Sequence, residues 1–161
     1  MNKKDYVIIL EPIGYWHKTL NSLKKSAKNI EEFRLLGLEN EFVQALINIL
    51  NNAKDALIDK GTPRLIFIDI SEKNNKAIIK ITDNGGGIDE KIIDKVCEPY
   101  FTTKHQSQGT GIGLYMTEEI IVKHMHGEFT IKNVETVYKN ITYKGAQIII
   151  GDCSEFCVSN R

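Results

Sequence analysis

The sequence lacks the features that mark several large classes of protein. Acidic and basic residues balance at 21 each, so the net charge favours neither a nucleic-acid partner nor a membrane surface. No apolar run is long enough to cross a bilayer, and the run near the N-terminus stops at Glu11-Pro12, too soon for a signal peptide. These absences, with 42% hydrophobic residues in 161, predict a globular protein with one main domain.

Cysteine is scarce as well. The three cysteines are Cys97, Cys153 and Cys157, and the last two have no second Cys/His pair at zinc-ligand spacing. An odd number of thiols without close pairs is typical of a reducing compartment. We therefore expect free thiols rather than a disulfide framework or a zinc site.

One stretch, residues 41–57, has no proline and no glycine, so a helix is allowed throughout. Apolar residues recur at helical spacing from Phe42 through Ile49 to Leu57 and predict a buried face. A second stripe on the same helix is polar and consists of Gln44, Asn48, Asn52 and Asp55. A buried amide without a partner costs about 1–3 kcal/mol. Either these side chains bond neighbouring backbone or water, or they bind something polar such as a metal ion and its ligand.

The remaining elements follow from local patterns. Apolar, β-branched runs predict strands at residues 5–10, 65–71, 77–82, 128–133 and 146–152, with an edge strand at 30–36. Helical spacing predicts helices at residues 15–29, 89–96 and 112–124. Residues 133–144 read as a connecting hairpin, and the polar segment 105–109 as a mobile stretch.

Glycine is concentrated in two loops. Asp83 directly follows the strand predicted at residues 77–82 and leads through Asn84 into Gly85-Gly86-Gly87, which suits a sharp turn or a close approach. A carboxylate facing a pocket there can accept a hydrogen bond from an exocyclic amine such as that of adenine. The second loop, Gly109 to Gly113, precedes a helix whose N-terminal amides can bind phosphate. It is not a dinucleotide-binding fingerprint, and the chain has no Walker A motif.

Taken together, four segments resemble the ATP-binding domain of the GHKL superfamily, and within it that of sensor histidine kinases. They are Gln44 to Asp55 (N box), Asp83 to Gly87 (G1 box), Glu98 to Lys104 (F box) and Gly109 to Leu114 (G2 box), in family order and at family spacing. The resemblance implies the Bergerat fold, an α/β (α+β) two-layer sandwich. In that fold a mixed, mostly antiparallel sheet carries about three helices on one face.

The resemblance also implies an organisation of the chain. Residues 30–152 would form the ATP-binding catalytic domain. Residues 1–29 would be an N-terminal extension or the remnant of a preceding helical domain, and residues 153–161 a C-terminal tail. We expect a cytoplasmic chain, or the cytoplasmic part of a membrane-anchored sensor, that itself contacts neither nucleic acid nor membrane.

Residue roles follow from the same resemblance, with ATP and Mg²⁺ as the implied ligands. Asn52 would ligate Mg²⁺ through its amide oxygen, and Asp83 would bind the adenine amine. Asn48 would support the phosphates and Lys104 would reach the terminal phosphate, which makes these two the implied catalytic residues. The full set of implied nucleotide-binding residues is Asn48, Asn52, Asp55, Asp83, Gly85, Gly87, Ile88, Thr102, Lys104, Gly109, Thr110, Gly111, Ile112, Gly113 and Leu114.

The type of reaction depends on one position of the N box. Superfamily members that hydrolyse ATP carry a glutamate one turn before the magnesium asparagine, as general base for water. This chain has Asn48 there, and an amide cannot accept a proton at neutral pH. The sequence therefore predicts transfer of the γ-phosphate to an incoming nucleophile, rather than hydrolysis. The resemblance to sensor histidine kinases implies that this nucleophile is a histidine of a dimerisation helix. A slow GHKL-type ATPase and a non-catalytic, nucleotide-gated regulator are the alternatives.

The phosphoacceptor histidine is not evident in this chain. His17 lacks the acidic residue and the proline that usually follow the acceptor in this family. We therefore expect the phosphoacceptor and dimerisation domain outside the chain, in cis within a longer protein or in trans, with a response regulator as an indirect partner.

Overall fold

The computed structural model describes residues 6–10, 39–61, 63–74, 76–104 and 109–151. The predicted helix at 15–29, the predicted edge strand at 30–36 and the tail at 153–161 lie outside the described residues, as does most of the predicted mobile segment 105–109.

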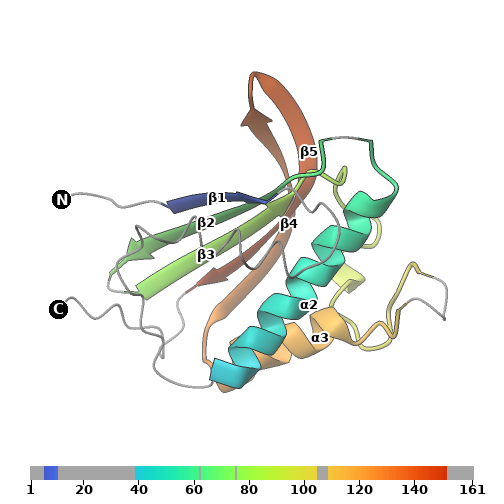
Figure 1. The fold of residues 1–161 in the computed structure, drawn as a ribbon. Helices are drawn as coiled ribbons and strands as arrows, with labels where there is room; N and C mark the ends of the chain where they lie inside the picture. The colour runs from blue at the N-terminus through green and yellow to red at the C-terminus, as the bar shows by residue number, and fades with distance from the viewer. Residues whose placement is uncertain (1–5, 11–38, 62, 75, 105–108, 152–161) are drawn as a thin grey trace.

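Five strands form one antiparallel sheet in the order β1-β2-β3-β5-β4 (Figure 1). They are β1 (Tyr6–Leu10), β2 (Ile66–Lys73), β3 (Lys76–Asp83), β4 (Glu128–Tyr138) and β5 (Ile141–Gly151). Isoleucines at alternate positions of β3, Ile79 and Ile81, point to the buried face, which is the expected pattern for a sheet covered on one side. β1, which lies within the predicted N-terminal extension, pairs with β2 at the edge of the sheet.

The two hairpins end in turns that need left-handed backbone. Asn74, with φ of 55°, lies in the turn that joins β2 to β3, so the hairpin expected there is present. Lys139 and Asn140, with φ of 49° and 62°, form a two-residue turn between β4 and β5. Residues 133–144 are thus a hairpin as predicted, but its strands stay paired up to this turn, and its tip projects beyond the rest of the sheet (Figure 1).

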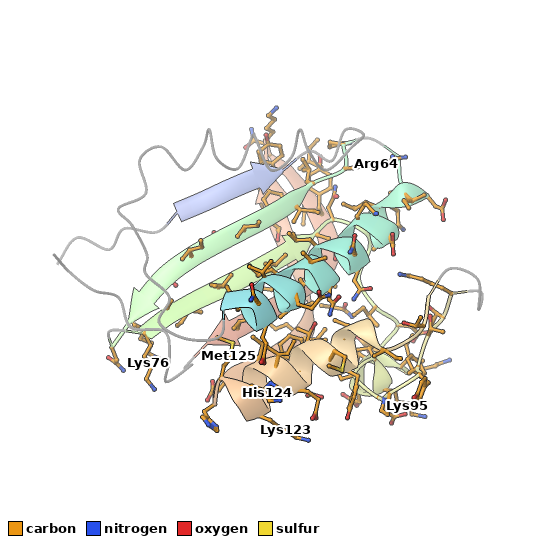
Figure 2. The ribbon with its side chains drawn as sticks, turned by 60° about the horizontal axis from the view of Figure 1, so that its bottom comes forward. Arg64, Lys76, Lys95, Lys123, His124 and Met125 are labelled. Atoms are coloured by element: carbon orange, nitrogen blue, oxygen red, sulfur yellow. The ribbon has the colours of Figure 1, made fainter. Side chains whose placement is uncertain are left out.

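Among the described residues, two helical segments cover one face of this sheet (Figures 1 and 2). The first is α2 (Glu39–Ile58), and the second is α3 (Gly113–Glu118), which continues as the π-helical segment η3 (Glu119–His124). His124 Nδ1 lies 2.5 Å from Glu41 Oε2, which joins the end of η3 to the first turn of α2. In the part of the chain that the structure describes, neither helix combines the length and hydrophobicity of a membrane span.

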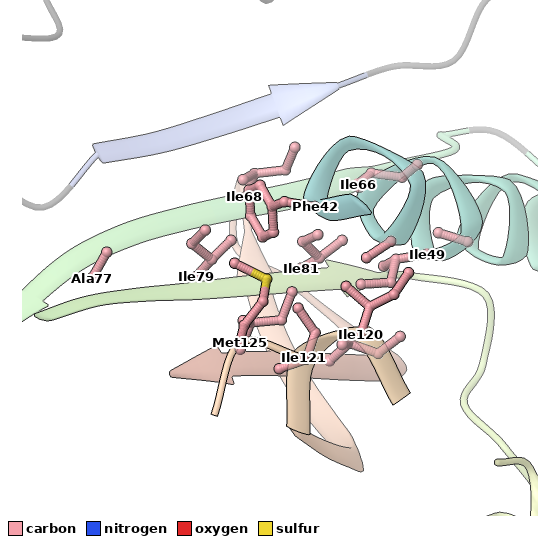
Figure 3. Packing of buried hydrophobic residues seen from close by; sticks show 14 of the residues in the cluster. Phe42, Ile49, Ile66, Ile68, Ala77, Ile79, Ile81, Ile120, Ile121 and Met125 are labelled. Atoms are coloured by element: carbon pink, nitrogen blue, oxygen red, sulfur yellow. The ribbon is translucent and has the colours of Figure 1, made fainter. Parts of the chain in front are cut away.

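The core lies between these helices and the sheet (Figure 3). Phe42 and Ile49 of α2 meet isoleucines of β2 and β3, and the second helix contributes Ile120 and Ile121. Ile120 and Ile121, at 4% and 0% exposure, lie three and four residues after the buried Thr117, which is the usual spacing of a buried helical face. Each such side chain contributes about 1.5–3 kcal/mol of burial free energy. This core fixes the polar stripe of α2 relative to the ends of β3 and β5. The two-layer α/β fold expected from the sequence is confirmed.

The helix predicted at residues 89–96 is replaced by a series of turns with one short 3₁₀ element, η2 (Ile93–Lys95). The Asp89 side chain accepts a hydrogen bond from Lys91 N at 2.9 Å, and its carbonyl accepts bonds from Ile92 N and Ile93 N. No residue of this segment is buried, and a short helix depends on a packed apolar face for its stability. Without such a face the segment forms local turns in place of the predicted helix.

Candidate functional site

A cavity of about 560 Å³ opens between α2, the two glycine loops and the ends of β3 and β5. This volume lies in the range of small-molecule and cofactor sites. Most of the predicted nucleotide-binding residues line it: Asn48, Asn52, Asp55, Asp83, Gly87, Ile88, Thr102, Lys104, Gly109, Thr110, Gly111, Gly113 and Leu114.

Two of the predicted residues have other surroundings. Gly85 N donates a hydrogen bond to Asp83 Oδ1, and the Gly85 backbone passes so close to Ala56 of α2 that an added Cβ would lie 2.9 Å from the Ala56 Cβ. Ile112 precedes α3, where its carbonyl accepts the Met116 amide. Both residues shape the loops that border the cavity without lining it.

The polar stripe of α2 faces this cavity in part. Asn48 accepts a hydrogen bond from Gln44 at 3.1 Å and donates one to the Gly113 carbonyl at 3.2 Å, which ties α2 to the start of α3. Asn52, one turn later, is half-buried at the cavity, and its side-chain amide has no hydrogen-bond partner among the described residues. The Asn52 amide oxygen is therefore available to a ligand.

Asp83 is the most buried charged group at the site, with 7% of its surface exposed. Its Oδ1 accepts two backbone hydrogen bonds, from Gly85 N at 2.7 Å and from Ala146 N at 3.3 Å. Burial raises the pKa of the Asp83 carboxyl, and these two bonds oppose that shift in part. Because both bonds use Oδ1, Oδ2 is the oxygen left for a ligand.

The backbone of Asp83 is held equally closely. A Cβ built on Gly145 of β5 would lie 1.6 Å from the Asp83 carbonyl oxygen, so only glycine fits at that position. Because the Gly145 backbone lies this close to Asp83, the next amide, Ala146 N, can donate a hydrogen bond to the Asp83 carboxylate. This contact fixes the carboxylate between the end of β3 and β5.

Gly145→Ala is therefore expected to destabilise the protein by about 3 kcal/mol or more, because β5 must move away from Asp83. Gly61 provides the matched control, since an added Cβ there meets nothing within 4 Å. Gly61→Ala should change the free energy of unfolding by less than about 1 kcal/mol. Chemical denaturation of the two variants measures the difference, and equal stabilities would contradict the close approach.

Lys104 and Asp55 pair across the mouth of the cavity. The Lys104 ammonium lies 2.6 Å from Asp55 Oδ2, and both side chains are about one third exposed, at 34% and 30%. Lys104 N also donates a hydrogen bond to Thr102 Oγ1, which fixes the turn that carries the lysine. The sequence placed both residues at the site but provided no sign that they bind each other.

Apolar side chains complete the cavity and were not predicted to bind. They come from β3, β4, β5 and the turns after the first glycine loop, and are Ile81, Ile92, Val96, Phe101, Ile131 and Ile148. Strand alternation would have found those of the sheet, because Ile81 and Ile148 are paired residues of neighbouring strands. The cavity thus combines an apolar floor with a few polar groups.

Comparison with known proteins places this geometry in a family. Residues 37–150, more than two thirds of the chain, match the family model described as histidine kinase-, DNA gyrase B- and HSP90-like ATPase. Among curated relatives, sporulation kinase A of Bacillus subtilis is 38% identical over 88 residues, which cover 55% of this chain. A putative sensor histidine kinase (NtrY-like) of Rickettsia conorii is 31% identical over 124 residues, or 76% of this chain. The chain spans only 14% and 20% of the lengths of these two relatives.

Solved structures share the fold. The nucleotide-free catalytic domain of the histidine kinase ThkA superposes with a TM-score of 0.60 at 21% identity, covering 94% of this chain and 95% of that one. Full-length ShkA in complex with AMPPNP gives a TM-score of 0.56 at 17% identity, covering 76% of this chain and 23% of that one. The chain therefore belongs to the family of histidine kinase-, DNA gyrase B- and HSP90-like ATPases, in which it has the fold and the motifs of a sensor histidine kinase catalytic domain.

Proposed function

We propose that this chain binds ATP with Mg²⁺ in the 560 Å³ cavity and transfers the γ-phosphate to a histidine of a partner domain. The observation that carries the proposal is the set of residues that line this one cavity. Asp83 supplies a buried carboxylate with one oxygen held by backbone, and Asn52 supplies an amide without a hydrogen-bond partner in the described part of the chain. Both line the cavity together with the two glycine loops.

The adenine would lie at Asp83. Its Oδ2 can accept a hydrogen bond from the exocyclic amine, while Ile81 and Ile148 offer apolar contact to the ring. Guanine carries an oxygen where adenine carries the amine, and two acceptors facing each other in a buried site are strongly disfavoured. The site therefore favours ATP over GTP.

The residues present fit a magnesium ion that is held mainly by the nucleotide. Mg²⁺ takes oxygen ligands and commonly completes its shell with phosphates and water, so one protein ligand is sufficient. The Asn52 amide oxygen would supply that ligand. The ion would neutralise charge on the phosphates, and the glycine loop at 109–113 would surround them with backbone.

Lys104 would support the terminal phosphate. An ion pair as exposed as Lys104–Asp55 contributes about 0–1 kcal/mol, so exchanging Asp55 for a phosphate oxygen costs little. Lys104 lines the same cavity as Asn52, so its ammonium would make this exchange within the site. The lysine would then stabilise negative charge that develops during transfer.

The acidic residues of the cavity argue against efficient hydrolysis. The carboxylates among the described lining residues are those of Asp55, Asp83 and Asp89. Asp83 accepts two backbone bonds and Asp89 accepts the Lys91 amide. Asp55, which pairs with Lys104 in the absence of nucleotide, stands about two helical turns beyond Asn48, the position that carries the base in hydrolysing members. Asn48 bonds Gln44 and Gly113 and cannot act as a base. A nucleophile supplied from outside fits this site better than a water molecule activated by it.

The proposal includes the organisation of the protein. Residues 30–152 would form the catalytic domain, and the phosphoacceptor histidine would lie on a dimerisation domain outside this chain, with a response regulator as the next acceptor. We place the reaction in the cytoplasm, where ATP is available.

The proposal is tested by incubating the chain with γ-labelled ATP, Mg²⁺ and a candidate dimerisation domain. We expect acid-labile, base-stable label on the dimerisation domain, as a phosphohistidine requires. An Asn52→Ala chain serves as the control and should transfer no label. Rapid release of labelled phosphate by the chain alone, without any labelled protein, would instead identify a hydrolase.

A further inference from the structure

The β4–β5 hairpin contacts the first glycine loop at three places, through Asn133, Lys144 and Ala146. These three hairpin residues lie outside the four motifs. We infer that Asn133 of β4 is a positioning residue, which holds the loop at Gly87 and Ile88 in the shape that binds the adenine. This inference rests on the proposed ATP site. Asn133 does not line the cavity itself, whereas Gly87 and Ile88 do.

The side-chain amide of Asn133 makes both of its hydrogen bonds to one residue. Ile88 N donates to Asn133 Oδ1 at 2.8 Å, and Asn133 Nδ2 donates to the Ile88 carbonyl at 2.7 Å. The amide thus pairs with the Ile88 backbone as a neighbouring strand would. Asn133 and Ile88 are 45 residues apart, so the pair fixes the loop to a different part of the fold.

Two further contacts join the same segments. Gly86 N donates to the Lys144 carbonyl at 3.0 Å, and Ala146 N donates to Asp83 Oδ1 at 3.3 Å. Loop residues 83–88 are therefore bound to both strands of the hairpin. The start of the loop is also held at Asn84, which bonds the Leu65 backbone and the Pro63 carbonyl. The backbone hydrogen bonds of Gly86 and Ile88, in contrast, go to the hairpin.

The residue types at positions 133 and 87 fit this contact specifically. An asparagine provides a donor and an acceptor in one plane, whereas aspartate lacks the donor and alanine lacks both. Gly87 has φ of +86°, and a Cβ there would lie 2.7 Å from Asn133 Oδ1. The glycine and the asparagine thus fit each other, because any side chain at position 87 would displace the amide.

The contact between Asn133 and Ile88 lies at the adenine end of the proposed site and not at the phosphate end. The residues assigned to the phosphates and the ion, Asn48, Asn52 and Lys104, lie on α2 and on the segment before the second glycine loop. They share no hydrogen bond with Asn133. Loss of the Asn133 amide should therefore weaken binding of the base and leave binding of the phosphates unchanged.

The test compares Asn133→Ala with Lys132→Ala, an exposed neighbour on the same strand. Calorimetric titration of the full chain with Mg-ATP should show about tenfold weaker binding for Asn133→Ala and wild-type binding for Lys132→Ala. Titration with Mg-tripolyphosphate, which has no base, should give the same Kd for all three proteins. Hydrogen exchange without nucleotide should show faster exchange of the Ile88 amide in Asn133→Ala only.

The readouts separate this inference from the proposed function. If the wild-type chain binds no Mg-ATP, the proposed function fails, whereas faster exchange at Ile88 would still support the contact. If Asn133→Ala weakens the binding of Mg-ATP and Mg-tripolyphosphate equally, or weakens neither, the positioning role is overturned.

Asn133→Asp provides a second variant of the same shape in case the alanine variant does not fold. It keeps the acceptor for Ile88 N and loses the donor, so its affinity for Mg-ATP should also fall while its affinity for tripolyphosphate does not.

Discussion

Replacing Asp83 with asparagine is expected to weaken Mg-ATP binding by about a hundredfold while leaving the fold intact. The asparagine oxygen can still accept the backbone bonds from Gly85 and Ala146, so the loop keeps its anchor. Its amide nitrogen then takes the place of Oδ2 and presents a donor to the donor amine of adenine. Isothermal calorimetry measures the loss of affinity, and circular dichroism checks the fold.

The same carboxyl predicts a pH dependence. Burial raises the pKa of Asp83, and a group whose pKa is higher in the folded than in the unfolded state favours folding most when it is protonated. Its contribution to stability is therefore largest below its unfolded pKa and is lost as the pH rises through the folded pKa. Above that folded pKa the buried charge costs stability, so in that pH range Asp83→Asn should unfold at the wild-type temperature or above it.

Affinity for ATP should follow the opposite trend. The ionised carboxylate is the stronger acceptor for the adenine amine, so the affinity should fall as the pH is lowered through the raised pKa of Asp83. In Asp83→Asn this part of the pH profile should be flat. An unchanged Kd for Asp83→Asn, or an identical pH profile in both proteins, would contradict the assignment of Asp83 to the base.

Asn52→Ala is the second change with a large expected effect. It removes the amide oxygen proposed as the protein's ligand to Mg²⁺, and we expect Mg-ATP to bind about a hundredfold more weakly, with transfer of the γ-phosphate lost. Asn52 has no hydrogen bond to another described side chain, so its removal should leave stability within about 1 kcal/mol of wild type.

The magnesium dependence supplies the internal control for this variant. In the presence of a chelator, wild type and Asn52→Ala should bind ADP equally, because the base and its contacts are unchanged. Adding Mg²⁺ should strengthen nucleotide binding in the wild type and have little effect in the variant. A variant that responds to Mg²⁺ as strongly as the wild type would show that the ion is bound without Asn52.

Sequence reasoning identified the elements whose signal is local. The run without proline and glycine from residues 41 to 57 predicted α2, and regular spacing located its polar stripe. Asp83 was identified because it stands between a predicted strand and a run of three glycines. These features depend on neighbours in the chain, and the structure has α2 and β3 where they were expected.

The contacts that sequence reasoning missed join residues far apart in the chain. Lys104 and Asp55 are 49 residues apart, and Asn133 and Ile88 are 45 apart. No periodic pattern records such a pair, because Lys104, Asp55 and Asn133 look like ordinary polar surface residues. Ile88 takes part only through its backbone, which its side chain does not reveal. The predicted helix at 89–96 was wrong because none of its residues is buried, so no packed face stabilises a helix there.

The central claim is that one cavity holds the adenine at Asp83 and the magnesium-bound phosphates at Asn52. A crystal structure of the chain with Mg²⁺ and a non-hydrolysable ATP analogue tests it most directly. We expect the adenine amine within hydrogen-bond distance of Asp83 Oδ2 and the ion coordinated by Asn52 Oδ1. Nucleotide bound elsewhere, or bound in this cavity with the phosphates at Asp83, would contradict the account.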